Sequence, residues 1–481
     1  MSTLVEILEN LDANAPMTID EIVQVEVSDW ESDKRRELME VGEEYYLVHN
    51  DVLKREKKTI DEDGREVKAK HVADNRIPHG FVRKLVDQKT DYLLARPFMV
   101  ETDNVEYQKE LDEIFDMAFK EQLKHQGTTA INAGISWMQV YYDDDSKLSF
   151  QHIPSIEAIP IWKDAAHTEL AAFIRVYERV EYVVRTKQTV KCVEFWHKDG
   201  VRFYESDGGA LKFVEEKNIL TLEGLPDGEQ LQFNWEKIPF QWFKYNNYEQ
   251  PLIDIIKRLV DDYDNQKSDN SSNLEDLPNG IYVVNNFGGT QAGEFRKNIA
   301  TYRVAFTREG GDVKTISMAM NNEGYAKHME QTRKDIYEFG RGVDTQSASL
   351  GNSPSGIALR FLYSDLDMDA NAIESQFQAS LQRLLWFINK HLLNTKKVDY
   401  SNEKVTFIFN RDIIINETEA VKNAKDSVGI ISNETIVANH PWPTNTKEEM
   451  KKIEKEKVGE LEKTDPYNNL NQEETPNGEP S

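Results

Sequence analysis

The segment PLIDIIKRLVDDYDNQKSDNSSNLED, residues 251–276, decides how the rest of the chain is organised. Apolar side chains in its first half recur at steps of 3, 1, 3, 1 and 3, which is one face of a helix. They are Leu252, Ile255, Ile256, Leu259, Val260 and Tyr263. After Tyr263 the pattern is polar on every side, and a helix that is polar all round does not pack in the core of its own subunit. We therefore expect a rod of about 40 Å that lies in solvent or between other bodies.

A second helical pattern, residues 321–340, follows a small insertion. A thin apolar stripe runs along it, formed by Tyr325, Met329, Ile336 and Phe339. The insertion, residues 280–320, contains a short apolar strand that ends in a Gly-Gly turn and a second strand pair around residues 309–312. The sequence therefore predicts a rod that leaves the body, a small α/β unit at its tip, and a rod that returns.

The loop DTQSASLGNSPS, residues 344–355, joins the returning helix to a long helical pattern at residues 356–393. Beyond Asp344 this loop carries no charge, and its Gly, Asn, Pro and Ser residues are typical of a loop. Connections between helices are commonly short, so a loop of this length between two strong helices is often functional.

The segment SGIALRFLYSDLDMDAN, residues 355–371, completes an order of elements that resembles the portal proteins of tailed bacteriophages. The type is that of long-tailed phages with Gram-positive hosts. NRIPHGFVRKLVDQKTDYLLARPF at residues 75–98 and PLIDIIKRLVDDYD at residues 251–264 resemble the same family. The likeness covers roughly residues 20–440 and rests on the number and order of these patterns, since none contains a catalytic invariant.

The resemblance implies an α+β subunit of portal type. The corresponding parts are an α+β wing (first part, 1–249), an outgoing stem helix (250–279), a small α/β clip (280–320), a returning stem helix (321–343), a tunnel loop (344–355), a long wing or tunnel helix (356–393) and a mostly α-helical crown (394–464). Residues 465–481 are poor in apolar side chains, which predicts a disordered tail.

The resemblance also implies a function in the virion. Portal proteins form a ring of twelve subunits at one capsid vertex, assembled in the host cytoplasm, and double-stranded DNA passes through the ring during packaging, retention and ejection. The implied partners are scaffolding protein, major capsid protein, the terminase and then head–tail adaptor proteins. The implied DNA-facing residues of the tunnel loop are Thr345, Gln346, Ser347, Ala348, Ser349, Leu350, Gly351, Asn352 and Ser353. The implied partner-binding residues of the clip are Asn286, Phe287, Gly288, Gly289, Arg308 and Glu309.

Ring size can be checked against the width of DNA. Twelve rods spaced about 10 Å apart give a radius near 19 Å and a bore of about 28 Å, whereas nine rods leave about 19 Å. A duplex about 20 Å wide passes through the first ring and not through the second.

Composition limits the alternatives. The chain of 481 residues has a net charge of −27, which argues against tight, sequence-reading DNA binding and agrees with a wall along which DNA stays mobile. One cysteine, Cys192, excludes internal disulfides. We expect no signal peptide, because the N-terminus lacks a basic region and a long apolar run, and no membrane span.

Acidic clusters suggest a second class of function. Asp143, Asp144 and Asp145 fit part of a two-metal nuclease site, but a solvated hairpin tip is the favoured interpretation. Asp365, Asp367 and Asp369 suggest a calcium loop, but the required Gly and Glu are replaced by Ala370 and Gln376. We interpret these acids as the start of a helix, where the positive end of the helix dipole stabilises acidic side chains.

We therefore expect no enzyme activity, cofactor or metal. An acidic metal-dependent DNA-processing enzyme and a capsid or tail component without a channel remain the alternatives.

Other elements are expected in order. Helices are predicted at 18–30 (capped by Thr18 or Asp20), 31–47, 75–94, 106–127, 418–427, 434–439 and 446–463. Strands are predicted around the turn at 61–64, and at 135–142, 148–153, 170–182, 191–197, 201–205, 405–409 and 413–415.

Overall fold

The computed structural model describes most of the chain and divides it into two compact units. The described residues are 17–60, 65–68, 73–183, 186–198, 200–206, 208–217, 221–222, 231–232, 235–275, 280–285, 310–317, 322–346, 356–411, 417–438, 440–443 and 446–464. Unit 1 comprises residues 1–344 and 365–412, and unit 2 comprises residues 345–364 and 413–481. The mixture of helices and sheets confirms the predicted α+β class.

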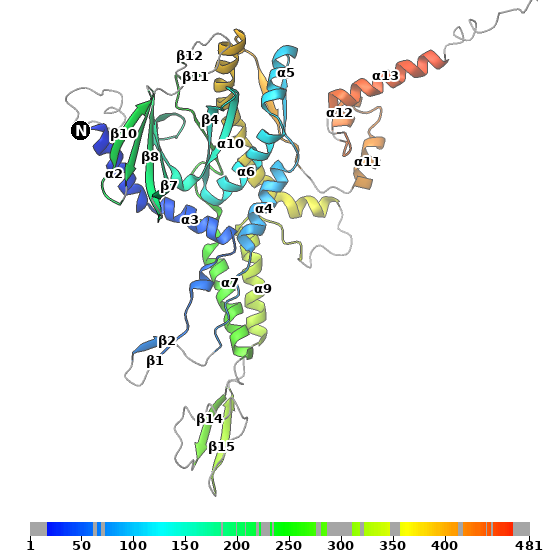
Figure 1. Cartoon of the computed structure of the whole chain (residues 1–481). Helices are drawn as coiled ribbons and strands as arrows, with labels where there is room; N and C mark the ends of the chain where they lie inside the picture. The colour runs from blue at the N-terminus through cyan, green and yellow to red at the C-terminus, as the bar shows by residue number, and fades with distance from the viewer. Residues whose placement is uncertain are drawn as a thin grey trace, which may run out of the picture. The chain divides into compact units, whose positions relative to one another are not determined.

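Unit 1 contains two main antiparallel sheets (Figure 1). The five-stranded sheet has the order β10-β9-β8-β7-β6, with strands β6 Ala158–Trp162, β7 Leu170–Val183, β8 Thr186–His197, β9 Gly200–Ser206 and β10 Lys212–Lys217. The three-stranded sheet has the order β13-β4-β5, with strands β4 Ile135–Tyr142, β5 Leu148–Ile153 and β13 Phe240–Lys244. Trp137 of β4 lies 4.9 Å, ring centre to ring centre, from Phe173 of β7, so the two sheets share one core.

Two helices open the described chain, α2 Ile19–Glu31 and α3 Lys34–Tyr46, followed by the 3₁₀ turn η1 Asp51–Lys54. Thr18 caps α2 in a capping box with Glu21, which confirms Thr18 rather than Asp20 as the cap. Asp33 caps α3 through the amide of Arg35. The expected hairpin after η1 is also present, because β1 Lys58–Ile60 pairs with β2 Glu66–Lys68.

Two predicted helix boundaries are wrong. Helix α4 spans Phe81–Leu94, so residues 75–80 are not helical. Pro78 explains this, since a proline disfavours helical backbone in the residue before it. The single helix expected at 106–127 is two helices, α5 Val105–Ile114 and α6 Met117–Ala133, because the Asp116 side chain caps the amide of Phe119 and starts a new helix.

Helices α7 Leu252–Glu275 and α9 Asn322–Phe339 confirm the two predicted rods and lie side by side (Figure 1). Met329 and Ile336 of α9 are buried, as the stripe predicts, whereas Phe339 is 57% exposed and does not belong to it. Between the two helices in sequence, β14 Gly280–Asn285 pairs with β15 Asp312–Ser317. Strand 280–285 is therefore confirmed, and residues 286–309 lie outside the described part of the chain.

The polar half of α7 corrects the central expectation about this helix. Asp264, Ser268 and Ser272 are 0% exposed, and their own chain covers them. The Ser272 and Ser268 hydroxyls accept hydrogen bonds from the amides of Asn75 (2.9 Å) and Ile77 (3.0 Å). We call these three α7 side chains the polar rail. A polar helix face can thus be buried inside one subunit when backbone amides satisfy it.

Asp264 is the N-terminal residue of the polar rail. Its Oδ1 accepts from the amide of His79 at 3.1 Å and lies 2.7 Å from Nδ1 of that ring. Its Oδ2 accepts from Nδ2 of Asn50 at 2.5 Å. Tyr263 adds an edge-on contact with the Phe81 ring at 4.9 Å, which joins α7 to the start of α4.

Helix α10 Gly356–Lys396 confirms the long predicted helix. The part of α10 in unit 1 carries many buried apolar side chains, including Ile373, Phe377, Leu381, Leu384 and Ile388. Strand β16 Val405–Ile408 follows it and pairs with β3 Met99–Thr102. Two short strands, β11 Thr221–Leu222 and β12 Leu231–Gln232, also pair with each other.

The later part of unit 2 contains α11 Glu417–Asp426, α12 Asn433–Ala438 and α13 Thr446–Thr464. Ser432 caps α12 by accepting from the amide of Thr435. The strand expected at 413–415 and the tail from residue 465 lie outside the described residues. Among the residues that the structure describes, no helix combines the length and the apolar character needed to cross a bilayer.

Candidate functional site

The segment predicted to face DNA starts just after α9, and the chain there is fixed by a side chain of α4. Gln88 Nε2 donates to the carbonyl oxygen of Val343 at 2.8 Å, and its Oε1 accepts from the amide of the same residue at 3.1 Å. Val343 is 2% exposed. An amide that pairs with both main-chain groups of one residue fixes the direction of the backbone as well as its position.

A tight turn brings the end of α9 against α4. Arg341 has φ +49°, and the amide of Gly342 donates back to the carbonyl of Tyr337 at 2.9 Å. A Cβ added at Gly342 would lie 2.1 Å from Cδ2 of Leu85, and one at Gly340 would lie 2.8 Å from Cδ1 of the same side chain. Only glycine allows this approach, so both glycines are needed to place the α9 terminus on α4.

A buried ion pair then links this turn to α10. Lys89 Nζ lies 2.6 Å from Oδ2 of Asp369 and donates to the carbonyl oxygen of Arg341 at 3.2 Å. The two side chains are 1% and 9% exposed. Tyr245 donates its hydroxyl to the same Asp369 oxygen at 2.9 Å. Burial lowers the pKa of Lys89, and the facing Asp369 carboxylate opposes that shift.

A second group of contacts holds α10 slightly earlier in the helix. The Tyr92 hydroxyl donates to Oδ1 of Asp367 at 2.6 Å. Arg411 binds the same oxygen at 3.1 Å and reaches Oε2 of Glu374 at 2.5 Å. Helix α10 starts at Gly356, so Asp365, Asp367 and Asp369 lie inside it, and our interpretation of these acids as a helix entry is wrong.

Helix α4 therefore carries three side chains that hold both flanks of segment 345–364. We call Gln88, Lys89 and Tyr92 the α4 clamp. Gln88 and Lys89 hold the preceding flank at Val343 and Arg341, while Lys89 and Tyr92 hold the following flank at Asp369 and Asp367. The clamp fixes the chain on either side of this segment.

The structure describes only the first two of the predicted tunnel-loop residues. Thr345 and Gln346 form a turn directly after Asp344. Asp344 accepts two hydrogen bonds from Arg333, each of 2.8 Å. Ser347, Ala348, Ser349, Leu350, Gly351, Asn352 and Ser353 lie outside the described residues. The clip residues Asn286, Phe287, Gly288, Gly289, Arg308 and Glu309 lie outside them as well.

The α4 clamp was not predicted from the sequence, although one residue of the clamp carries a signal for it. Lys89 follows Leu85 by four residues and precedes Leu93 by four, which puts a lysine on the apolar stripe of an amphipathic helix. A lysine in such a place needs a buried acidic partner. Its partner lies 280 residues away in the sequence and could not be identified from spacing.

The acidic clusters do not support metal chemistry in the described part of the chain. Asp143 accepts from the amides of Asp145 and Lys147 at 3.0 and 2.8 Å, which confirms the predicted hairpin tip. The bond from the Lys147 amide lowers the pKa of Asp143. The described residues contain no group of three or more His, Cys, Asp or Glu side chains that could hold a metal ion.

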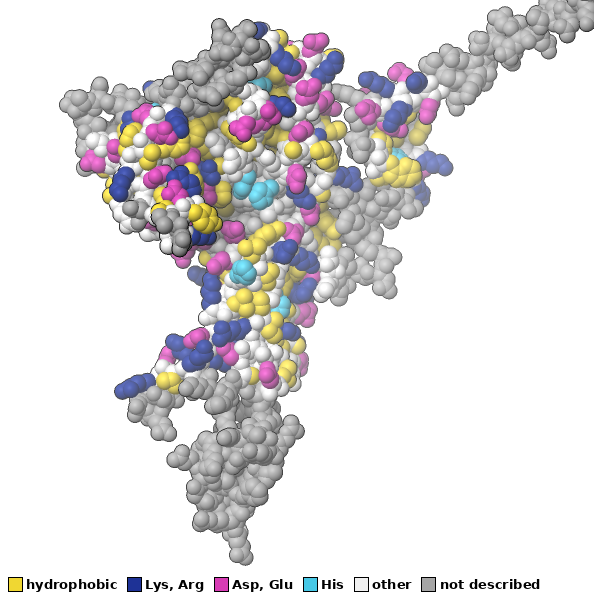
Figure 2. Space-filling model, in the orientation of Figure 1, with side chains coloured by type: hydrophobic (Ala, Val, Ile, Leu, Met, Phe, Trp, Pro, Cys, Tyr) yellow, Lys and Arg dark blue, Asp and Glu magenta, His cyan; other side chains and the backbone are white. Residues whose placement is uncertain are grey.

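The charged side chains of α7 and α9 show no single sign. Figure 2 shows Lys and Arg side chains mixed with Asp and Glu side chains on the displayed face of these two helices. Several are paired, for example Lys257 with Asp261 at 2.8 Å and His328 with Asp262 at 2.8 Å. Such pairs weaken the attraction of this face for phosphates, because the paired cations already have an anion beside them.

A family model described as "Phage portal protein, SPP1 Gp6-like" matches residues 28–463. The chain belongs to this phage portal family. Two curated relatives are each named "Portal protein". That of Clostridium phage phiCD119 is 29% identical over 454 residues, covering 91% of this chain and 96% of the relative. That of Bacillus phage SPP1 is 28% identical over 424 residues, covering 86% and 82%.

Solved structures add a weaker similarity. The neck of an empty gene transfer agent particle aligns with a TM-score of 0.41 at 11% identity, covering 74% of this chain and 88% of the other. The family assignment rests on the sequence matches. It confirms the resemblance to portal proteins of phages with Gram-positive hosts.

Proposed function

We propose that this portal-family chain forms a ring around a channel through which double-stranded DNA is packaged, retained and ejected at one capsid vertex. The observation that carries the proposal is the family match, which extends over residues 28–463. The family is structural, and we propose that the chain is not an enzyme and that ATP hydrolysis belongs to a terminase partner. The ring would be assembled in the host cytoplasm and retained in the virion.

The contacts on either side of the loop support a DNA-facing role for residues 345–353, within the tunnel loop 344–355. A loop that touches moving DNA must be held firmly at both ends, because otherwise it would follow the DNA instead of guiding it. The α4 clamp provides this at Val343 and Asp369. Thr345 to Ser353 would line the channel with neutral side chains, which contact phosphates without capturing them.

The remaining assignments follow the same proposal. Helices α7 and α9 would be the stem, the β14–β15 pair would belong to the clip, and α11 to α13 would belong to the crown. The clip residues Asn286 to Gly289, with Arg308 and Glu309, would contact the terminase and later the head–tail adaptors. Scaffolding and major capsid proteins would bind elsewhere on the ring. Closure of the ring requires a head-to-tail interface between copies.

Deletion of Ser347–Asn352 tests the function of the loop. We expect rings to assemble normally in negative-stain micrographs, because both anchored flanks remain, and DNA packaging into procapsids to fail. A control of equal length removes six residues from the tail, Glu474–Glu479, and should package normally. Normal packaging by the loop deletion would contradict the channel assignment. A subunit that forms only monomers or open fibres in every condition would contradict the ring itself.

A further inference from the structure

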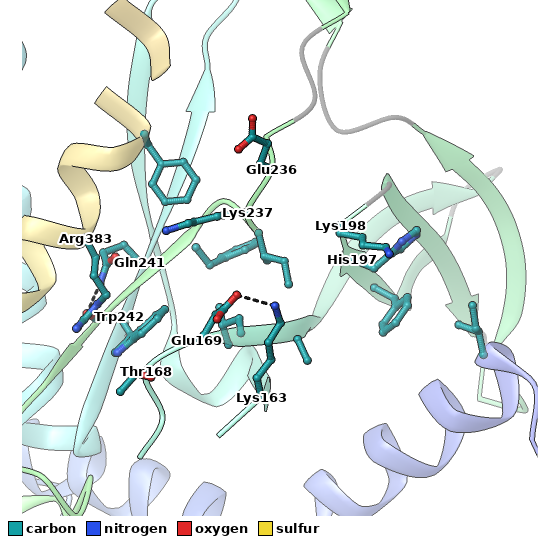
Figure 3. A pocket seen from close by; sticks show the side chains of 17 residues that line it. Lys163, Thr168, Glu169, His197, Lys198, Glu236, Lys237, Gln241, Trp242 and Arg383 are labelled. Carbon is teal, nitrogen blue, oxygen red and sulfur yellow. Dashed lines mark hydrogen bonds and ion pairs between the residues drawn. The ribbon is translucent and has the colours of Figure 1, made fainter. Parts of the chain in front are cut away.

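A cavity of about 380 Å³ opens in unit 1 between the two sheets and α10 (Figure 3). It is not part of the α4 clamp. Its floor is apolar and largely aromatic, formed by Leu170, Phe195, Ile238, Phe240, Trp242 and Phe387, all of which are buried. A cavity of this volume can hold a few aliphatic side chains or one apolar group of similar size.

The rim of the cavity is basic, in contrast to the chain as a whole. Four cationic side chains line it, Lys163, Lys198, Lys237 and Arg383, against the acids Glu169 and Glu236. Both acids are already paired, Glu169 with Lys163 at 2.6 Å and Glu236 with Lys390 at 2.9 Å. Within the described residues, Lys237 and Arg383 have no acidic partner within 4.0 Å. In a protein with net charge −27, this is a local surplus of positive charge.

Two buried donors at the cavity also lack acceptors. Trp242 is 5% exposed, and its Nε1 has no hydrogen-bond partner among the described residues. The Arg383 guanidinium stacks on the Trp242 ring at 4.6 Å, and its Nε is likewise buried without a partner in the described part of the chain. Burial lowers the pKa of Arg383 to about 10, so the side chain stays charged at neutral pH. Two unsatisfied donors on residues that line a hollow can bind an acceptor that enters it.

The N-terminal segment of the chain has the matching chemistry and starts beside the cavity. Ile19, the first residue of α2, lines the cavity. The sequence before it, MSTLVEILENLDANAP at residues 1–16, contains three acids and no base. Leu4, Leu8 and Leu11 recur at the spacing of one helix face. The C-terminal tail from residue 465 is also acidic, but it carries far fewer apolar residues.

We propose that this cavity is a binding site for residues 1–16 of this polypeptide. The leucine side chains of the segment enter the apolar hollow, and Glu6, Glu9 or Asp12 supplies the carboxylate that Arg383 and Lys237 lack. Because the segment is covalently joined to the chain and ends three residues before Ile19, its effective concentration at the cavity is on the order of millimolar, so modest contacts suffice for binding. The site would hold the N-terminus against the body of the subunit.

Photo-crosslinking on the full-length chain tests the proposal. A benzophenone amino acid replaces Leu8, and crosslinked peptides are mapped by mass spectrometry. We expect crosslinks to the peptides that contain Ile238, Phe240 or Phe387. The variant Lys237→Glu should reduce the yield about tenfold, because it replaces attraction to a carboxylate of the segment by repulsion. A reporter at Val25, an exposed residue of α2, is the control and should not reach these peptides.

Charge exchange makes the test specific. The double substitution Glu6→Lys and Glu9→Lys should lower the yield by itself, and combining it with Lys237→Glu should restore most of the yield. Lys147→Glu, an exposed lysine far from the cavity rim in sequence and not lining it, should change nothing. Glu6 and Glu9 lie outside the described residues, so these substitutions change no residue that the structure describes, and they remain informative if Lys237→Glu unfolds. Crosslinks elsewhere, or a yield insensitive to both charge reversals, would overturn the proposal.

Discussion

Helix α7 buries the same face along its whole length, but the two halves of that face have opposite polarity. In the first half the buried side chains are Ile253, Ile256 and Val260, and in the second half they are Asp264, Ser268 and Ser272, each 0% exposed. The first set contacts other apolar side chains of the main core. The second set contacts the backbone of residues 75–79. What covers a helix face therefore decides its chemistry, and a face covered by backbone must be polar.

The need for the polar rail comes from the covering segment. Residues 75–79 belong to no helix or strand, so their amides have no secondary-structure partner. A buried amide without an acceptor costs about 1–3 kcal/mol. The side chains of the polar rail recur every four residues on α7. They accept hydrogen bonds from every second amide of the extended chain, at Asn75, Ile77 and His79. Side chains at this spacing thus replace the neighbouring strand that a sheet would supply.

Substitution of Asp264 should give the largest effect in this comparison. Asp264→Ala removes the acceptor of the His79 amide, of the His79 ring and of Asn50 Nδ2 at once. We expect a loss of about 3–5 kcal/mol in the free energy of unfolding, as for breaking other buried charged networks. Chemical denaturation of the purified subunit measures it. Asp262→Ala, on the exposed side of the same turn, should lose less than about 1 kcal/mol. Equal losses would show that the polar rail does not stabilise the subunit.

The apolar half provides the next largest effect. Ile256→Ala should cost about 2–4 kcal/mol, because it leaves a cavity in a region that cannot collapse. Ile255→Ala is a matched control one residue earlier, since Ile255 is 44% exposed and Ile256 is 0% exposed. The same denaturation experiment measures both. If Ile256→Ala cost more than Asp264→Ala, apolar packing would contribute more to the stability of α7 than the hydrogen bonds to the backbone of residues 75–79.

The order of elements could be predicted well from the sequence, for physical reasons that particular residues show. Regular apolar spacing marked α7, α9 and α10, and turn residues marked the hairpin at Asp143. The polar rail could not be predicted, because the spacing rule treats a polar side chain as exposed. Nothing local in residues 264–272 reveals that residues 75–79 will lie against them.

The candidate site shows the same limit. The loop after Asp344 could be placed from composition alone, since an uncharged connection between two helices is visible in the sequence. The contacts of the α4 clamp could not be predicted from the sequence, because Gln88 and Val343 are 255 residues apart. Tyr92 and Asp367 are 275 residues apart. Long-range pairs of this kind become visible only when α4 has been placed.

Within the polar rail, Ser268→Ala should give a smaller loss than Asp264→Ala. It leaves the buried Ile77 amide without its acceptor, with no charged group affected. We expect a loss of about 1–2 kcal/mol in the free energy of unfolding. Gln266→Ala, at an exposed position two residues earlier, should lie within about 0.5 kcal/mol of the parent. A neutral result for Ser268→Ala would mean that water replaces the hydroxyl and that this face is less closed than its burial indicates.

The smallest expected effect is also the most local, at Ser272. Ser272→Ala removes the acceptor of the Asn75 amide, but Asn75 keeps a side-chain bond to Oε2 of Glu275 at 2.7 Å near the end of the helix. We therefore expect a loss of only about 0.5–1 kcal/mol. Hydrogen exchange resolves such a loss residue by residue, because 1.4 kcal/mol is a factor of ten in an opening equilibrium. The Asn75 amide should exchange about threefold faster, with the amides of Ile77 and His79 unchanged. Faster exchange at all three would show that the polar rail opens as one unit, and the contrast with the apolar half would then lie in cooperativity as well as in polarity.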